Sequence, residues 1–112
     1  MSRILFIDST YPESYDFETL SARAMGGTES SILRTAEILQ KQGHDVAICQ
    51  HSRDFRVEQQ QITFHSQNSC QSEAFDHVVV LRKLPQLTKY QKHFPKANFY
   101  FLPWRFIPFI RR

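Results

Sequence analysis

Two adjacent glycines, Gly26 and Gly27, stand directly before a helical pattern and offer the clearest chemistry in the chain. The first N–H groups of a helix have no partner within the helix, and with the helix dipole they favour a bound phosphate. Because glycine has no Cβ, a ligand can approach its backbone closely. We predict a phosphate site at Gly26, Gly27 and Thr28. An ordinary turn is the alternative, because the pattern is neither GxGxxG nor GxxxxGK[ST].

A second group of polar residues is expected at the ends of two strands. Ser9 follows the apolar run 3–8, and Arg82 ends the valine-rich run that begins at Asp76. In an open parallel sheet, ligands bind outside the carboxyl ends of the strands, where the strand order reverses. The start of the helix after Gly27 is expected at the same rim, so we predict that Ser9, Glu29 and Arg82 line a cleft there, next to Asp8. For Arg82, a solvated strand end is the alternative.

Strands and helices must position these residues. Short runs rich in β-branched residues predict strands, and apolar residues three and four apart predict helices. Thr28 is predicted to cap the first helix, and Gly43 to close it in the left-handed conformation. The polar stretch between the first strand and this helix is long enough to predict a functional loop. Strands are expected at 3–8, 45–49, 62–64, 76–82 and 98–102, and helices from Thr28 to before Gly43 and from Leu84 to Phe94.

This alternation of strands and helices predicts an α/β fold. Parallel neighbours need crossover connections, which are almost always right-handed. We expect a doubly wound, Rossmann-like parallel sheet in a single three-layer domain over residues 1–102, with the strand at 76–82 in its interior. Residues 103–112 form an apolar and basic tail beyond that domain.

Length and charge limit the classes of function. A chain of 112 residues can bury one core, so we expect one domain and no cleft between two lobes. Residues 1–76 have six basic and eleven acidic side chains, a net −5, and residues 77–112 have eight basic and no acidic ones, a net +8. Such a basic end suits nucleic acid, anionic lipid or phosphate, or it complements the acidic part within the fold.

Cysteines, leader signals and motifs add further expectations. No leader pattern precedes the first strand and no long apolar run occurs, so we expect a cytoplasmic protein, free or at the membrane surface. Cys49 and Cys70 are expected to be a reduced structural pair rather than a disulfide. Together with His51 and His65 they lack zinc-finger spacing, so no metal site is expected. No nucleophile motif such as GxSxG is present, and the sequence identifies no catalytic residue.

Four short motifs occur in one order along the chain. They are Leu5-Phe6-Ile7, Gly26-Gly27-Thr28-Glu29, the helix end Gln42-Gly43-His44-Asp45-Val46, and the strand 76–82. This arrangement resembles the N-terminal domain of GT-B glycosyltransferases of family 4. In that family a first strand, a Gly-Gly-(small)-Glu loop and a helix closing in Gly-His-(acid)-Val follow one another from the start. The resemblance covers roughly residues 3–102.

The resemblance implies retaining transfer of a sugar from a nucleotide-sugar donor to a sugar or glycan acceptor that lies mostly on this domain. It places the N–H groups of Gly26 and Gly27 near the donor diphosphate, with Thr28 and Glu29 as neighbours. The family's second domain, which holds most of the nucleotide and a pair of glutamates, does not follow in this sequence. We therefore expect a truncated, acceptor-side half that is inactive without a C-terminal domain, with no cofactor and no nucleic-acid partner.

The tail at 103–112 has three interpretations, and one of them is that it is sequence out of its original reading frame. Its apolar side chains suit a surface that meets the missing half, and its aromatic and arginine residues also suit an anchor at the membrane surface. The alternative function for the whole chain is a stand-alone α/β interaction module. Such a module would bind an anionic partner or a membrane through the basic C-terminal part.

Overall fold

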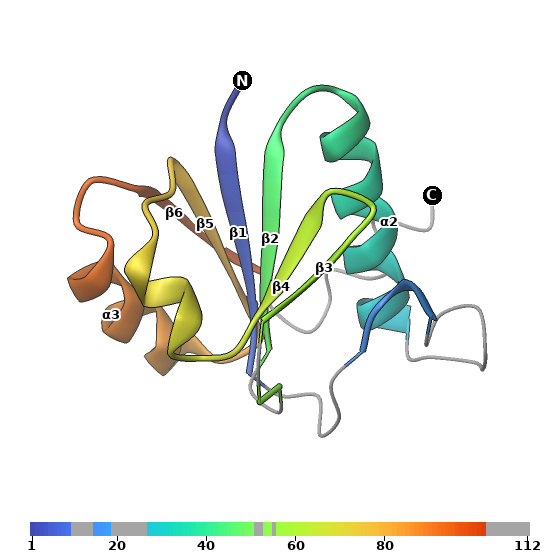
Figure 1. Ribbon diagram of the computed structural model, residues 1–112. Helices are drawn as coiled ribbons and strands as arrows, with labels where there is room; N and C mark the ends of the chain where they lie inside the picture. The colour runs from blue at the N-terminus through green and yellow to red at the C-terminus, as the bar shows by residue number, and fades with distance from the viewer. Residues whose placement is uncertain (10–14, 19–26, 51–52, 55, 103–112) are drawn as a thin grey trace.

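The computed structural model describes residues 1–9, 15–18, 27–50, 53–54 and 56–102 (Figure 1). Among these residues it is an α/β fold with a six-stranded mixed sheet and two α-helices. The strands are β1 (Arg3–Asp8), β2 (Asp45–Gln50), β3 (Val57–Gln59), β4 (Ile62–His65), β5 (His77–Leu81) and β6 (Asn98–Leu102). The helices are α2 (Gly27–Lys41) and α3 (Leu84–His93), with a 3-10 turn, η1, at Ser69–Ser72. The predicted tail at 103–112 lies outside the described residues.

The strand order in the sheet is β3-β4-β2-β1-β5-β6. From β1 the chain builds β2 and β4 on one side, and it then returns to build β5 and β6 on the other side of β1. These five strands are parallel, as predicted, and β5 lies in the interior between β1 and β6. The strand at β3 was not predicted, and it is antiparallel to β4, so the sheet is mixed rather than wholly parallel. The order reverses between β1 and β5.

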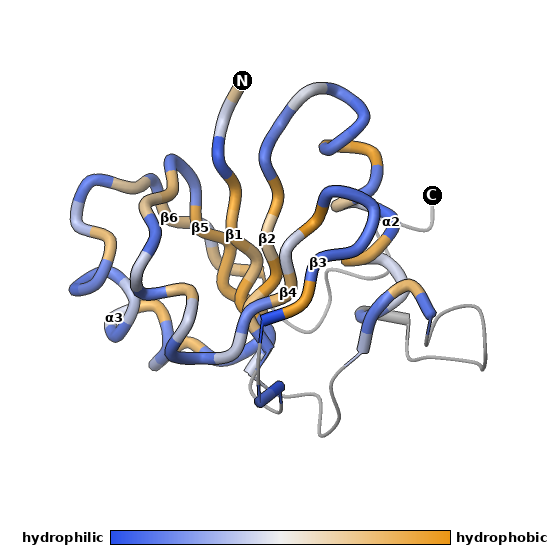
Figure 2. The backbone as a smooth tube through the Cα atoms, in the orientation of Figure 1, coloured by the Kyte–Doolittle hydropathy of each residue, from blue (hydrophilic) through white to orange (hydrophobic). Residues whose placement is uncertain are grey.

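The central strand β1 is largely hydrophobic (Figure 2), and its side chains alternate between two buried apolar clusters. Ile4 and Phe6 belong to a cluster that includes Ile32 and Leu33 of α2. Leu5 and Ile7 belong to a cluster that includes Tyr90 of α3. Successive residues of a strand point to opposite faces, so the near-continuous apolar run predicted at 3–8 is explained by burial on both sides. Each fully buried side chain of this size stabilises the fold by about 1.5–3 kcal/mol.

The end of helix α2 follows from its sequence. Gly43 has φ +97°, as predicted, which a residue with a side chain rarely adopts. Its N–H donates to the Gln40 carbonyl at 3.0 Å, and the His44 N–H donates to the Leu39 carbonyl at 3.1 Å, the pair of bonds of a Schellman motif. At the other end the helix begins at Gly27, so Thr28 lies within it. The prediction that Thr28 is the cap is therefore wrong by at least one residue.

A hairpin joins β3 to β4 through Gln60 and Gln61 (Figure 1). Both residues have positive φ, 51° and 64°, which is the conformation of a two-residue type I′ turn. Asparagine and glycine are the usual residues in such turns. A Gln-Gln turn carries no such signature, which is why β3 escaped prediction.

Helix α3 follows β5 as predicted. Its first turn contains Pro85, where the missing N–H removes no intrahelical hydrogen bond. Phe94 caps the other end, and its N–H donates to the Tyr90 carbonyl at 2.9 Å. Neither helix in the described part of the chain is long and apolar enough to cross a membrane.

Candidate functional site

Three ionic side chains meet at the carboxyl ends of β1 and β5. Asp8 is the last residue of β1, Arg82 directly follows β5, and Glu29 lies in the first turn of α2. Nη2 of Arg82 donates to Oδ1 of Asp8 at 2.9 Å and to Oε2 of Glu29 at 2.8 Å. The side chains of Arg82, Asp8 and Glu29 are 7%, 0% and 4% exposed. The guanidinium of Arg82 therefore bonds to Asp8, 74 residues earlier in the chain, and to Glu29, 53 residues earlier.

Tyr15 completes this group, which we call the rim cluster (Asp8, Tyr15, Glu29 and Arg82). Its hydroxyl donates to Oδ2 of Asp8 at 2.7 Å, so both oxygens of that carboxylate are engaged. The Tyr15 side chain is buried. Burial, and then the negative charge of Asp8, raise the pKa of Tyr15 well above its usual value. The hydroxyl therefore stays protonated and acts as a permanent donor to Asp8.

The backbone of Tyr15 is held by the end of β2. Nε2 of Gln50 donates to the Tyr15 carbonyl at 2.7 Å, and Nε of Arg53 donates to Oε1 of Gln50 at 2.8 Å. Nη2 of Arg53 lies 3.8 Å from Oδ2 of Asp16, and burial lowers the pKa of this arginine. A short stretch of the long loop predicted after β1 is thus fastened to the sheet next to the rim cluster.

Charge in the rim cluster limits what it can bind. It contains one guanidinium and two carboxylates, a formal net charge of −1 when all three are ionised. A phosphate that approached Arg82 would have to displace carboxylates that already bond to it in a buried setting. The arrangement makes Arg82 a group that positions the strand ends and the start of α2 rather than a ready phosphate ligand.

The backbone of Arg82 is in the left-handed region, with φ +66°. For a residue with a side chain this costs about 1–2 kcal/mol. Its N–H donates to the Leu102 carbonyl at 2.8 Å, and its guanidinium holds the two carboxylates. Such strain persists only where surrounding contacts enforce it, and it concentrates at functional sites.

The predicted site residues are brought together in part. Glu29 and Arg82 are in direct contact, and Ser9, 7% exposed, directly follows Asp8 in the chain. Gly27 begins α2 two residues before Glu29, so the start of the helix lies at the same rim. Gly26 lies outside the described residues, as does the side chain of Thr28. Sequence reasoning placed Asp8 at this rim but missed Tyr15, Gln50 and Arg53.

The missed residues carried no recognisable signal. Tyr15 and Arg53 are single residues in irregular stretches, Gln50 is the last residue of β2, one position beyond the predicted strand, and no motif spacing links the three. Only the fold shows that the end of β2 meets the loop after β1, since β1 and β2 are neighbours with Asp8 opposite Gln50.

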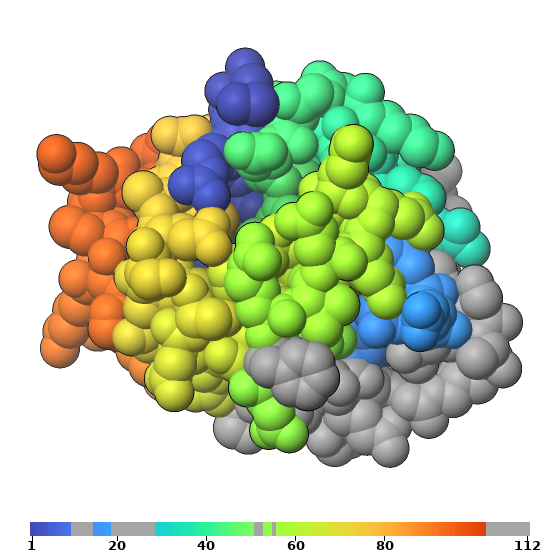
Figure 3. Space-filling view, in the orientation of Figure 1, coloured from blue at the N-terminus to red at the C-terminus, as the bar shows by residue number. Residues whose placement is uncertain are grey.

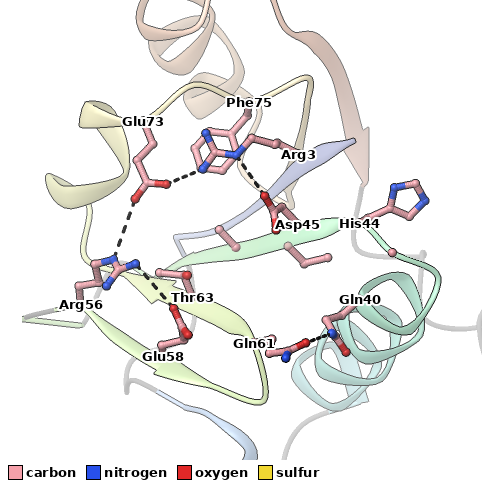
Figure 4. Close-up of a pocket in the computed structure, with 13 residues that line it drawn as sticks. Arg3, Gln40, His44, Asp45, Arg56, Glu58, Gln61, Thr63, Glu73 and Phe75 are labelled. Atoms are coloured by element: carbon pink, nitrogen blue, oxygen red, sulfur yellow. Dashed lines mark hydrogen bonds and ion pairs between the residues drawn. The ribbon is translucent and has the colours of Figure 1, made fainter. Parts of the chain in front are cut away.

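A separate polar pocket of about 490 Å³ lies over the first residues of β1 and β2 and beside the β3–β4 hairpin (Figures 3 and 4). Glu73 lines it between two arginines, 2.7 Å from Nη2 of Arg3 and 4.0 Å from Nε of Arg56. Arg3 and Arg56 are 38% and 51% exposed, and ion pairs of this kind contribute little to stability. The pocket is lined at the amino ends of the strands, away from the rim where parallel sheets place their ligands.

The two cysteines lie side by side in the core. Cys49 and Cys70 are buried free thiols whose sulfur atoms are 3.5 Å apart, and the Tyr90 hydroxyl is 3.7 Å from Sγ of Cys49. The hydrogen bond from Cys70 lowers the pKa of Cys49, and the same contact, with burial, raises the pKa of Cys70. No group of three or more potential metal ligands occurs among the described residues. His51 lies outside the described residues.

No family model matches this sequence, and no curated protein or solved structure matches it either. The geometry of the rim and the motifs in the sequence are therefore the features that point to a function.

Proposed function

We propose that this chain is the N-terminal, acceptor-side domain of a nucleotide-sugar-dependent glycosyltransferase. The observation that carries the proposal is the convergence, where the strand order reverses, of the start of α2 with the ends of β1 and β5. That is where open α/β sheets bind their ligands. The resemblance to family 4 of the GT-B enzymes supplies the ligand class.

The proposal includes a doubly wound, Rossmann-like arrangement of three layers. Its support is the pair of apolar clusters, because alternate residues of β1 pack with α2 and with α3. In such folds the first helix after the first strand points its free N–H groups at the phosphates of a nucleotide. Gly27, the first residue of α2, is the described residue best placed for this contact.

Arg82 and its two carboxylates serve this site by positioning. The ion pair to Glu29 fixes the first turn of α2 against the end of β5, and the bond to Asp8 fixes the end of β1. We assign the donor diphosphate to the backbone N–H groups at Gly26, Gly27 and Thr28. These 112 residues supply one wall of a cleft, so we expect weak binding but no sugar transfer unless a second, nucleotide-holding domain is present.

The test is a titration of the ¹⁵N-labelled chain with pyrophosphate and with UDP-glucose, followed by NMR. We expect shifts in the first turn of α2 and weak affinity. Replacing Gly27 by valine should abolish the shifts, since the side chain blocks close approach to the backbone. The matched control is Arg34→Val, which places the same residue on an exposed part of α2. Equal affinities for wild type and Gly27→Val would rule the proposal out.

One observation favours the alternative, an interaction module that binds anionic surfaces. Lys83, Lys89, Lys92 and Lys96 are all exposed on or beside α3, and this stretch contains no acidic residue. A surface of this kind attracts anionic lipid. At 0.1 M salt the attraction extends only about 10 Å, and higher salt shortens this range further. Flotation with phosphatidylglycerol vesicles should then exceed flotation with phosphatidylcholine and collapse in high salt. Equal flotation with both lipids would exclude this function.

A further inference from the structure

The outer edge of β6 is open among the described residues. The Asn98 N–H donates to the Asp76 carbonyl at 2.9 Å, and the Leu102 carbonyl accepts from the Arg82 N–H at 2.8 Å. Backbone groups alternate in direction along a strand, so residues 98, 100 and 102 bond toward β5. The N–H and carbonyl groups of Phe99 and Phe101 therefore point in the opposite direction, outward in the plane of the sheet and away from β5.

Within its described residues, this edge has none of the charges, prolines or bulges that discourage strand pairing. The five residues of β6, Asn-Phe-Tyr-Phe-Leu, include no charge and no proline, and their register with β5 is unbroken by a bulge. The opposite edge, β3, is only three residues long and carries Glu58. Short and charged edges resist pairing, whereas long, uncharged apolar edges invite it.

We propose that β6 pairs with β6 of a second copy of this chain, antiparallel and with the two-fold axis at Tyr100. This register places the outward backbone groups of Phe99 opposite those of Phe101 in the second copy. Each such pair exchanges two hydrogen bonds. The two-fold axis creates two equivalent pairs, so the two strands share four hydrogen bonds. No charge from either β6 opposes the contact. Two copies of β6 are thus complementary to each other, and their pairing joins the two sheets into one continuous sheet.

A hollow beside Tyr100 adds apolar surface to this contact. It has a volume of about 370 Å³, and its lining consists of the apolar side chains of Ile4, Phe6, Leu39 and Val79, the Tyr100 ring, and the polar residues Ser2, His44 and His77. The Tyr100 side chain is 47% exposed. In the proposed register the Tyr100 ring of the second copy stands directly beside it on the same face, at the mouth of the hollow. Both rings then lose solvent contact, which adds hydrophobic stabilisation to the four hydrogen bonds.

The contact uses no residue of the rim cluster, so it stands or falls independently of the proposed function. The first experiment is sedimentation velocity of the full chain from low- to high-micromolar concentration. We expect a monomer–dimer equilibrium. The variant Tyr100→Lys, which puts two like charges face to face at the axis, should shift it to monomer. Thr88→Lys, on the exposed side of α3, should leave it unchanged.

The second experiment tests the register with single cysteines and oxidised glutathione. At the axis, the two copies of residue 100 form a pair with Cα atoms about 4.5 Å apart, within reach of a disulfide. Tyr100→Cys should give a covalent dimer as two thiols are oxidised and glutathione is reduced. Asn98→Cys is the control on the same face of β6, because its two copies are offset by about 13 Å along the strand. The wild type controls for the buried Cys49 and Cys70.

Two results would overturn the proposal. One is a wild-type chain that remains a monomer at every concentration, which would mean that something other than a second copy covers the edge. The other is equal crosslinking of Tyr100→Cys and Asn98→Cys, which would mean that association uses a different register or surface. Circular dichroism and thermal melting of each variant establish that it is folded before either result is scored.

Discussion

Replacing Arg82 by methionine tests whether the rim cluster holds the sheet together. Methionine keeps the bulk of the side chain but removes the guanidinium, so the buried carboxylates of Asp8 and Glu29 lose the charged hydrogen bonds that Arg82 makes to them. Breaking a buried ion pair in this way costs about 3–5 kcal/mol. All three side chains are at most 7% exposed, so solvent screening does not reduce this figure much. The Tyr15 hydroxyl still donates to Asp8, and we therefore expect about 3 kcal/mol.

Urea unfolding followed by circular dichroism measures this loss. The free energy of unfolding of a typical domain is about 5–15 kcal/mol. The variant is therefore expected to fold but to unfold at a much lower urea concentration. Most of the cost should come from Glu29, and the double variant Arg82→Met with Glu29→Gln should recover about half of it. The control is Arg34→Met on the exposed side of α2, expected within about 0.5 kcal/mol of wild type. A loss below about 1 kcal/mol for Arg82→Met, or no recovery in the double variant, would refute this account of the cluster.

Two further predictions concern buried polar groups. Tyr15→Phe removes a hydrogen bond to a buried carboxylate and should lower the free energy of unfolding by about 1.5–3 kcal/mol in the same urea assay. Burial lowers the pKa of His65 below its usual 6.5, while Glu73, 3.2 Å from Nε2, raises it in part. The unfolded chain therefore takes up a proton first as pH falls below about 6.5, so stability is full above that pH and is lost below it. His65→Asn should remove this part of the slope, and Glu73→Gln should steepen it.

Matched variants control both predictions. Tyr100→Phe removes a solvent-exposed hydrogen bond between the Tyr100 hydroxyl and Nδ1 of His77, 3.1 Å apart, and should change stability by less than about 0.5 kcal/mol. A loss as small for Tyr15→Phe would show that Asp8 does not need that donor. His93→Asn, at an exposed position of α3, should keep the wild-type pH dependence. If His65→Asn keeps it as well, burial of the imidazole is not its source.

Much of the fold could be predicted because its signals are local. The valines of β5 and the apolar run of β1 identify interior strands, and Gly43 identifies the end of α2, where the structure has it at φ +97°. The strand β6 was predicted with its observed bounds. The hairpin at Gln60 could not be predicted, because its turn lacks the usual residues.

The candidate site could be predicted only in outline. Spacing and strand order placed Glu29 and Arg82 at one rim, and the structure brings them into contact. The sequence did not indicate that they bond to each other, since ion pairing over 53 residues leaves no trace in local pattern. Tyr15 and Gln50 were missed for the same reason: their bonds depend on which strands are neighbours.

The long span of the rim cluster has a consequence for synthesis of the chain. Asp8 leaves the ribosome 74 residues ahead of Arg82, a delay of about 4–15 s at ordinary rates of elongation. During that time β1 has β2 on one side but no β5 on the other, and the carboxylates of Asp8 and Glu29 have not yet met the guanidinium of Arg82. The nascent chain therefore cannot complete the pairing and burial of β1 until β5 and Arg82 have been synthesised, and it must avoid aggregation until then.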